Sequence, residues 1–201
     1  AFRISYVGEQ GFELYFDFDS GLPLWDQLFA LGVVPIGVET YANSRRLEKS
    51  LRLQNADLET DFNLYEAGLA RSVVKKAAFH GKSAYLAQRG LDQQTSYLCT
   101  LVMLANEDAE GIKRYPIGEW PILDADTGLV VIDAKGRRSF STSISYGPSL
   151  GRNLLLAYLP ADRAIVGETF ILEYFCEHYP IRVEAVGSTP VLDPDNERPR
   201  S

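Results

Sequence analysis

The residues with the clearest potential to bind a polar ligand lie in the segment SYVGEQGFELYF, residues 5–16. In an extended strand Glu13 lies on the opposite face from Phe12 and Leu14, beside Tyr15. A carboxylate accepts two parallel hydrogen bonds from a ring that offers an N–H and an amino group side by side, as pterins and guanine-like rings do. The spacing alone favours a solvated strand glutamate, and the alternative is a ligand-binding Glu13 that points into a cavity.

Other signatures of chemistry are missing from the sequence. There is no G-x-S-x-G elbow, no P-loop and no G-x-G-x-x-G motif that opens a helix, so no catalytic residue is indicated. His80 and His178 have no Cys or His neighbour at ligand spacing, and we expect no metal. Cys99 and Cys176 each lie in an apolar, β-like run and are expected to be buried free thiols in a reducing compartment. The expected location is the cytoplasm, or the mitochondrial matrix in a eukaryote.

Composition and charge exclude several classes of partner. The chain has 27 Asp and Glu against 20 Lys and Arg, a net charge of −7, and no basic run that could follow a phosphate backbone. Its longest apolar stretches, such as NLLLAYLP, fall short of the roughly 20 residues that span a bilayer. With 46% hydrophobic residues, we expect a globular chain without nucleic-acid or membrane partners, of undetermined oligomeric state.

The first half of the sequence predicts a mixture of strands and helices. Period-two alternation predicts a hairpin over residues 2–18, turning between Gly8 and Gly11. Helical spacing predicts helices over residues 22–32 and 37–51, and a short helix that ends at Gly90. This order of elements is an α+β arrangement.

The character of the sequence changes near residues 90–95. From Thr95, short apolar or β-branched runs follow one another, bounded by Gly, Pro, Asn and Asp, which predicts a small antiparallel barrel or sandwich. The last stretch, LDPDNERPRS, is polar and is expected to run over the surface or fray.

Several segments, in order along nearly the whole chain, match the motif series of one known family. SYVGEQGFELYF is similar to G-Y-T-G-E-x-G-[FY]-E, YEAGLA to P-L-E-A-G-L, and FHGKSAYLAQR to F-x-G-[RK]-x-A-L. RRLEKSLRLQNADL, SYGPSLGRNLLLAYLP and PVLDPDNERPR match further motifs of the series. The chain thereby resembles the glycine-cleavage T-protein (aminomethyltransferase) family.

The resemblance implies a fold and a domain division. Residues 1–92 would be the C-terminal part of an α/β folate-binding aminomethyltransferase domain, residues 93–188 a small antiparallel β-barrel, and residues 189–201 a polar tail. The first part of the family fold, with the aspartate credited with catalysis, would precede residue 1. The chain therefore resembles a C-terminal piece, which is expected to be inactive alone.

The resemblance also implies binding residues. Tyr6 matches the family tyrosine that lines the folate pocket, and Glu13 matches the glutamate that hydrogen-bonds the pterin, so tetrahydrofolate is the implied cofactor. Glu9 is expected to serve the turn between the strands.

One departure from the motif series affects the choice of relatives. T-proteins place an arginine six residues before the glutamate of R-L-E, where this chain has Ala42. The flavin-linked dimethylglycine and sarcosine dehydrogenases also lack that arginine, and their N-terminal half binds FAD. The resemblance thus favours the folate-binding portion of a flavin-dependent N-methyl amine dehydrogenase, with folate and a small N-methylated amine as partners. The alternatives are a folate-dependent methyltransferase or demethylase without flavin, and a non-catalytic structural module.

Two further sets of residues are considered as possible ligand contacts. Trp25, Tyr41 and Phe79 are expected in the core rather than stacked on a ligand. Tyr146 and Arg152 flank a barrel loop, and the alternative is that they face the folate pocket across the domain boundary.

Overall fold

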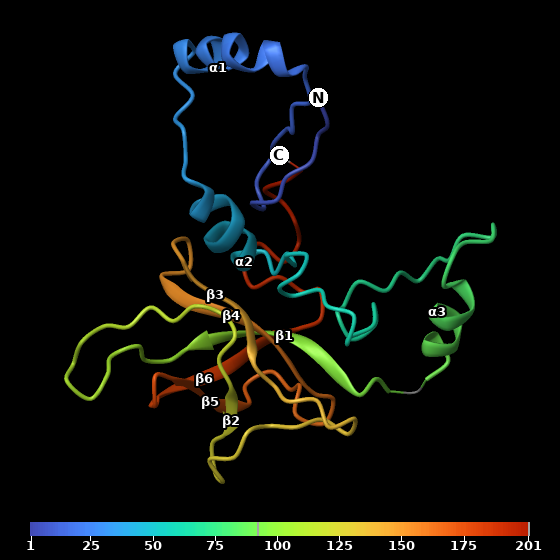
Figure 1. Cartoon of the computed structure of the whole chain (residues 1–201), viewed down its shortest axis with the longest axis vertical. Helices are drawn as coiled ribbons and strands as arrows, with labels where there is room; N and C mark the ends of the chain where they lie inside the picture. The colour runs from blue at the N-terminus through green and yellow to red at the C-terminus, as the bar shows by residue number, and fades with distance from the viewer. Residues whose placement is uncertain (92, 201) are drawn as a thin grey trace.

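The chain combines a loosely packed N-terminal region with a C-terminal sheet (Figure 1). The structure, a computed structural model, describes residues 1–91 and 93–200. The N-terminal region contains the elements η1 (Phe18–Ser20), α1 (Gly21–Ala30), the π-helical η2 (Thr40–Arg45), α2 (Arg46–Glu48) and α3 (Lys82–Arg89). The strands of the sheet are β1 (Ser96–Met103), β2 (Ile122–Asp124), β3 (Ser141–Gly147), β4 (Arg152–Pro160), β5 (Thr169–Tyr174) and β6 (Glu177–Val186).

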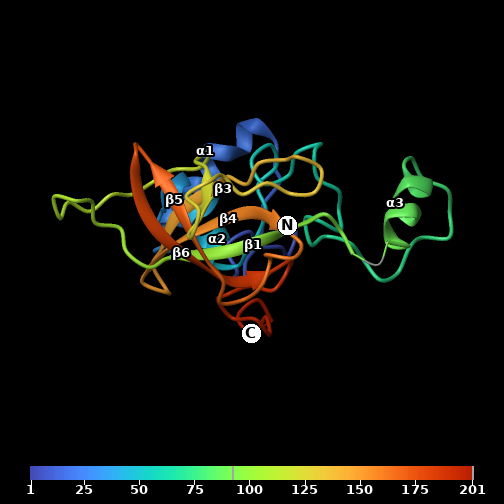
Figure 2. The ribbon, with the colours of Figure 1, turned by 90° about the horizontal axis from the view of Figure 1, so that it is seen from below.

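The six strands form one antiparallel sheet in the order β2-β5-β6-β1-β4-β3. The sheet is strongly curled (Figure 2), and its two edges approach each other. The Ser141 amide donates to the Trp120 carbonyl at 2.8 Å, and the Ile122 amide donates to the Ser139 carbonyl at 3.0 Å. The expected α+β class is therefore confirmed, and the region predicted to be a small antiparallel barrel or sandwich forms a curled antiparallel sheet.

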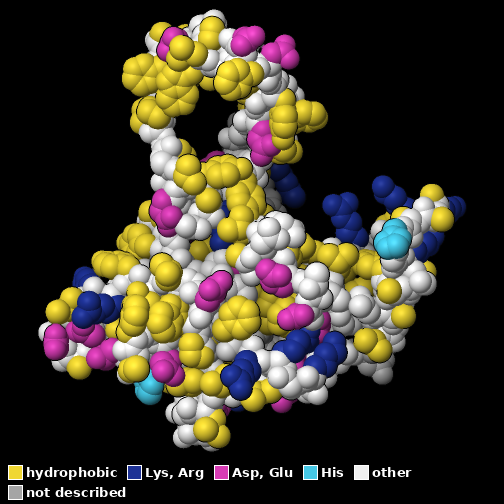
Figure 3. All heavy atoms as spheres, in the orientation of Figure 1, with side chains coloured by type: hydrophobic (Ala, Val, Ile, Leu, Met, Phe, Trp, Pro, Cys, Tyr) yellow, Lys and Arg dark blue, Asp and Glu magenta, His cyan; other side chains and the backbone are white. Residues whose placement is uncertain are grey.

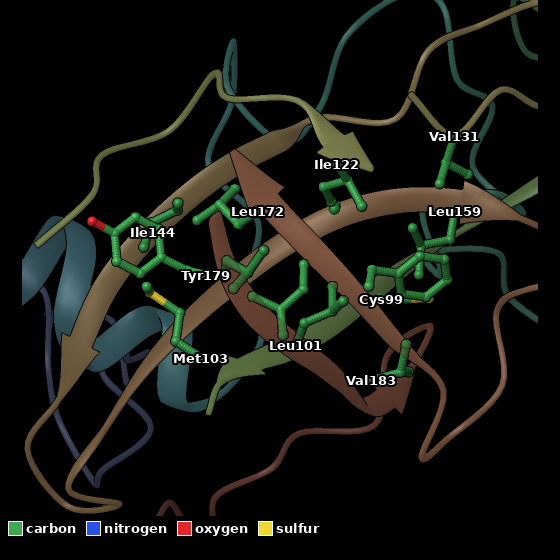
Figure 4. Close-up of a cluster of buried hydrophobic side chains, with 14 residues drawn as sticks. Cys99, Leu101, Met103, Ile122, Val131, Ile144, Leu159, Leu172, Tyr179 and Val183 are labelled. Atoms are coloured by element: carbon green, nitrogen blue, oxygen red, sulfur yellow. The ribbon is translucent and has the colours of Figure 1, made fainter. Parts of the chain in front are cut away.

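Apolar side chains fill the inside of the curled sheet (Figure 4). The neighbouring strands β4, β1 and β6 contribute Leu155, Leu101 and Val183, which lie side by side in the register of the sheet and are fully buried. Burying several such side chains at about 1.5–3 kcal/mol each makes this cluster the main source of stability. The full set is Cys99, Leu101, Met103, Ile122, Val131, Ile144, Leu155, Ala157, Leu159, Phe170, Leu172, Tyr179, Ile181 and Val183.

The two cysteines are free thiols in different surroundings. Cys99 is buried in β1, and burial raises the pKa of its thiol to about 12. The prediction that Cys176 is also buried is wrong. Cys176 and Phe175 form the two-residue turn between β5 and β6, and both have positive φ, as a type I′ hairpin turn requires.

The predicted N-terminal hairpin forms only in part. Residues 2–18 contain no regular strand, and an isolated antiparallel bridge between Phe2 and Glu13 joins the two arms. Two strands without a third strand or a packed face are marginal in water, which accounts for the short pairing.

Residues 12–38, termed the apolar arch below, stand away from the sheet around α1. Figure 3 shows this arch enclosing an opening, with apolar side chains along it. No residue of α1 is buried, and Trp25 is 55% exposed. Tyr41 and Phe79 are 42% and 43% exposed, so the prediction that all three aromatic residues lie in the core is wrong. For Trp25 the reason is that no described segment packs over α1.

The other helices lie close to their predicted positions. The second predicted helix begins later and ends earlier than expected, with η2 and α2 covering Thr40–Glu48. Helix α3 ends at Arg89 with Gly90 as its C-cap, as predicted. The predicted domain boundary at residue 92 lies outside the described residues, between α3 and β1. None of the described helices is long and apolar enough to cross a membrane.

Candidate functional site

Glu13 is held at the bridge between the two arms of the motif segment, residues 5–16. Its backbone exchanges two hydrogen bonds with Phe2, each 2.9 Å long. Its carboxylate accepts a hydrogen bond of 2.9 Å from the Tyr15 hydroxyl. Phe12 and Leu14 are exposed at 62% and 42%. The backbone therefore fixes Glu13, and its carboxylate lies beside Tyr15 as the alternation predicts, with oxygen lone pairs left for a ligand.

Tyr6 lies on the other arm and is half-buried. Its hydroxyl donates to the carbonyl of Arg52 at 2.6 Å, and its ring lies 5.5 Å from the ring of Tyr41. Burial raises the pKa of Tyr6 above its ordinary value, so the phenol stays protonated at neutral pH. No hydrogen bond or ring contact joins Tyr6 to Glu13. What Tyr6 can offer a ligand is therefore its ring, because its hydroxyl is used within the protein.

The turn between the two arms is packed against the segment after α2. Gly8 is buried with φ +73°, and a Cβ on it would lie 2.0 Å from Cγ of Lys49. The Lys49 ammonium in turn donates to the Asp193 carboxylate at 3.1 Å. Only glycine fits at position 8, because the backbone has a positive φ there and because a Cβ would clash with the Lys49 side chain.

Beside this turn lies a group of polar residues that sequence reasoning missed, termed the ionic clamp. The Glu9 carboxylate pairs with Arg45 and, at 3.0 Å, with Arg198. Arg45 also pairs with Glu48 at 3.0 Å and donates to the hydroxyl of Ser149. The clamp thus joins the motif turn, α2, the β3–β4 turn and the C-terminal tail. Glu9 therefore links the motif turn to Arg45 and to Arg198, two distant segments, in addition to the local turn role predicted for it.

Arg45 lies three residues after Ala42, the position at which the family's motif series has an arginine. Its guanidinium is shared among Glu9, Glu48 and Ser149, which leaves it committed within the protein. The Glu48 carboxylate is fully buried and also accepts the Ser149 amide at 2.6 Å and the Leu150 amide at 3.1 Å. The R-R-L-E run gives a helical i,i+3 pair from Arg45 to Glu48, and this is the one part of the clamp that spacing could have indicated.

A second buried ion pair fastens α2 to the sheet. Arg46 is 1% exposed and donates to the Asp57 carboxylate at 2.5 Å and to the Ser143 hydroxyl at 2.6 Å. Asp57 also accepts hydrogen bonds from Thr142 and, at 2.8 Å, from Ser143. Because β3 supplies both hydroxyls, α2 has a fixed position on the sheet. The motif turn packs against Lys49 directly after α2, so its position is fixed as well.

Tyr146 and Arg152 line a cavity of about 720 Å³ at one end of the sheet. The same cavity is lined by Met103, Asn153 and Arg182. None of its lining residues belongs to the motif segment. The alternative that Tyr146 and Arg152 face a folate pocket therefore stays a prediction.

The fold and this motif arrangement agree with comparisons against known proteins. The family model described as "GCVT N-terminal domain" matches residues 1–77. The solved aminomethyltransferase T of the glycine cleavage system from Bartonella henselae superposes with a TM-score of 0.74, at 23% identity, over 96% of this chain and 49% of that chain. This likeness defines the fold as that of the aminomethyltransferase class.

Sequence relatives narrow the class to a family. The aminomethyltransferase of Moorella thermoacetica is 34% identical over 172 residues, which are 82% of this chain and 42% of the relative. Human mitochondrial dimethylglycine dehydrogenase is 32% identical over 186 residues, 90% of this chain and 20% of the relative. The chain belongs to the glycine-cleavage T-protein family, as predicted, and it spans less than half the length of these curated relatives.

Proposed function

We propose that the chain is the tetrahydrofolate-binding portion of an aminomethyltransferase-like enzyme. The observation that carries the proposal is the placement of Glu13, whose backbone is fixed by the bridge to Phe2 and whose carboxylate keeps acceptor capacity beyond its bond to Tyr15. The match of residues 1–77 to the GCVT N-terminal domain supports the same assignment. The domain division follows from it, with residues 1–92 contributing to the folate site, residues 93–188 forming the supporting barrel and residues 189–201 the tail.

In this proposal the chain holds and orients the folate. Glu13 accepts a pair of hydrogen bonds from the N–H and amino group of the pterin, which fixes the ring in its plane. Tyr6 offers the face or edge of its half-buried ring, while its hydroxyl stays bound to Arg52. Bound folate supplies the amine that accepts the one-carbon unit. The chain contributes proximity and exclusion of water, which can lower a barrier by about 7–11 kcal/mol when the geometry is favourable.

The donor in this proposal is an N-methylated amine oxidised by a flavin held elsewhere in the enzyme. The support is that Ala42 replaces the T-protein arginine, that Arg45 is committed to the ionic clamp, and that dimethylglycine dehydrogenase is among the relatives. The apolar arch is the surface over which the other wall of the site would pack, because its side chains lack cover from any described segment.

Tetrahydrofolate titration of the purified protein tests the Glu13 assignment. Glu13→Gln should weaken binding about tenfold or more, because a hydrogen bond to a charged group contributes about 1.5–3 kcal/mol. Glu59→Gln removes an exposed carboxylate outside the motif and serves as the matched control, with unchanged affinity. Equal affinity of the two variants would show that Glu13 does not bind the pterin.

The flavin-linked donor is tested separately. Conversion of dimethylglycine that requires an electron acceptor supports the dehydrogenase. Direct transfer of a methyl or aminomethyl group to folate without any electron acceptor favours the flavin-free alternative. A protein that binds no folate and carries out neither reaction would be a structural module.

A further inference from the structure

Residues 67–91 form an arm that carries positive charge only. It contains no Asp or Glu, although the chain as a whole has a net charge of −7. The arm projects from the sheet in Figure 1 and in Figure 2, and Figure 3 shows Lys and Arg side chains gathered on it. Its cationic residues are Arg71, Lys75, Lys76, Lys82 and Arg89.

The arm has a defined internal structure. The Tyr85 hydroxyl on α3 donates to the carbonyl of Arg71 at 3.0 Å and accepts its amide at 2.9 Å. The Lys82 ammonium donates to the carbonyls of Lys75 and Lys76 at 2.9 and 2.8 Å. These contacts hold the loop against the first turn of α3. Lys82 is therefore a positioning residue.

The remaining cations of the arm have no carboxylate partner among the residues that the structure describes. Within the ranges 1–91 and 93–200, no carboxylate lies at ion-pair distance from Arg71, Lys75, Lys76 or Arg89. The arginines of the ionic clamp and Arg46, in contrast, are each paired. A cluster of unpaired like charges in an otherwise acidic protein is costly alone and becomes favourable when an acidic partner covers it.

An apolar pocket lies between these charges. Its volume is about 380 Å³, and Val73 is the most exposed apolar residue of its lining, at 83%. The pocket is lined by Leu64, Leu69, Arg71, Val73, Val74, Lys75, Phe79 and Tyr85. A concave apolar pocket of this size accepts one large side chain, and such anchors supply most of the energy of an interface. A flat lipid surface has no side chain that could fill the hollow, so the shape favours a protein partner.

We propose that the arm is a docking surface for an acidic protein segment that inserts one aromatic or aliphatic side chain into this pocket. Carboxylates on both sides of the inserted residue pair with Lys75, Lys76 and Arg71. The proposal is independent of folate binding, because it uses neither Glu13 nor Tyr6.

Fluorescence anisotropy with a labelled peptide EEGFGEE tests the surface. We expect saturable binding that weakens at least tenfold when the phenylalanine is replaced by alanine, and that also weakens as the Debye length falls from about 30 Å at 0.01 M salt to about 3 Å at 1 M. Lys75→Glu/Lys76→Glu should reduce affinity at least tenfold. The matched control Lys113→Glu/Arg138→Glu makes the same change of charge at exposed cations outside the arm and should have little effect.

Three outcomes would overturn the proposal. Absence of peptide binding would show that the arm needs no acidic partner or is covered within the protein. An equal loss in both double variants would show attraction to overall charge only. Binding of phosphatidylserine vesicles that the peptide does not displace would make the arm a lipid-binding element.

Discussion

At the scale of single residues, the buried pair of Arg46 and Asp57 decides whether the N-terminal region stays fixed on the sheet. Replacing Asp57 by Asn leaves the guanidinium buried without a counter-charge, which typically costs about 3–5 kcal/mol. We expect Asp57→Asn to lower the free energy of unfolding by an amount in this range, measured by urea denaturation. Asp61→Asn changes an exposed carboxylate nearby and should cost less than about 0.5 kcal/mol. A similar small loss for both variants would mean that the pair has no structural role.

The same scale shows what spacing in the sequence can and cannot reveal about the site. The alternation with Phe12 and Leu14 predicts the face on which Glu13 lies, and its contact with Tyr15 follows from that spacing. The ligand-binding role of Glu13 is implied by the family resemblance and not by the spacing. The ionic clamp was not indicated, because Glu9 pairs with Arg45 at a separation of 36 residues and with Arg198 at a separation of 189. Such pairs depend on the tertiary fold, and local patterns carry no information about them.

At the scale of elements, the contact between the turn before Ala70 and the end of β6 depends on a glycine. Gly68 has φ +68°, and a Cβ on it would lie 2.7 Å from backbone atoms of Gly187. Gly128 has the same φ but open space around it. Gly68→Ala should therefore cost about 2–4 kcal/mol, from backbone strain and overpacking, and Gly128→Ala about 1 kcal/mol from strain alone. Denaturant unfolding of the two variants measures the difference, and equal losses would contradict the close contact.

Elements marked by a capping glycine or by β-branched runs were predicted well. Elements whose formation or burial depends on another segment that packs over them were not. Helix α3 ends where Gly90 predicts, and the β-branched runs after Thr95 became strands because neighbouring strands pair with them. Residues 2–18 have a clear alternation but form only one bridge, because no third strand or packed layer completes them. Trp25 was assigned to the core by its residue type, whereas its burial depends on a surface that no described segment provides.

At the scale of the whole molecule, stability is concentrated in the sheet while the proposed functional surfaces lie outside it. The curled sheet holds the larger buried cluster, and ion pairs of Arg45 and Arg46 hold the motif turn and α2 beside it. The apolar arch and the arm of residues 67–91 project away from the sheet. Binding surfaces are commonly found on such weakly packed segments supported by a rigid scaffold.

This distribution predicts a wide range of hydrogen-exchange rates in the same protein. Helix α1 has 10 residues, none of them buried, and isolated helices shorter than about 12–15 residues are marginal in water. Its amides should exchange almost as fast as those of an unfolded peptide, whereas the amides of β1, paired on both sides, should exchange only through global unfolding. Exchange measured by mass spectrometry on peptides from residues 21–30 and 96–103 gives both rates. Protection of α1 equal to that of β1 would mean that a surface covers the apolar arch, for example in a second copy of the chain, and repeating the exchange at a series of protein concentrations distinguishes that case.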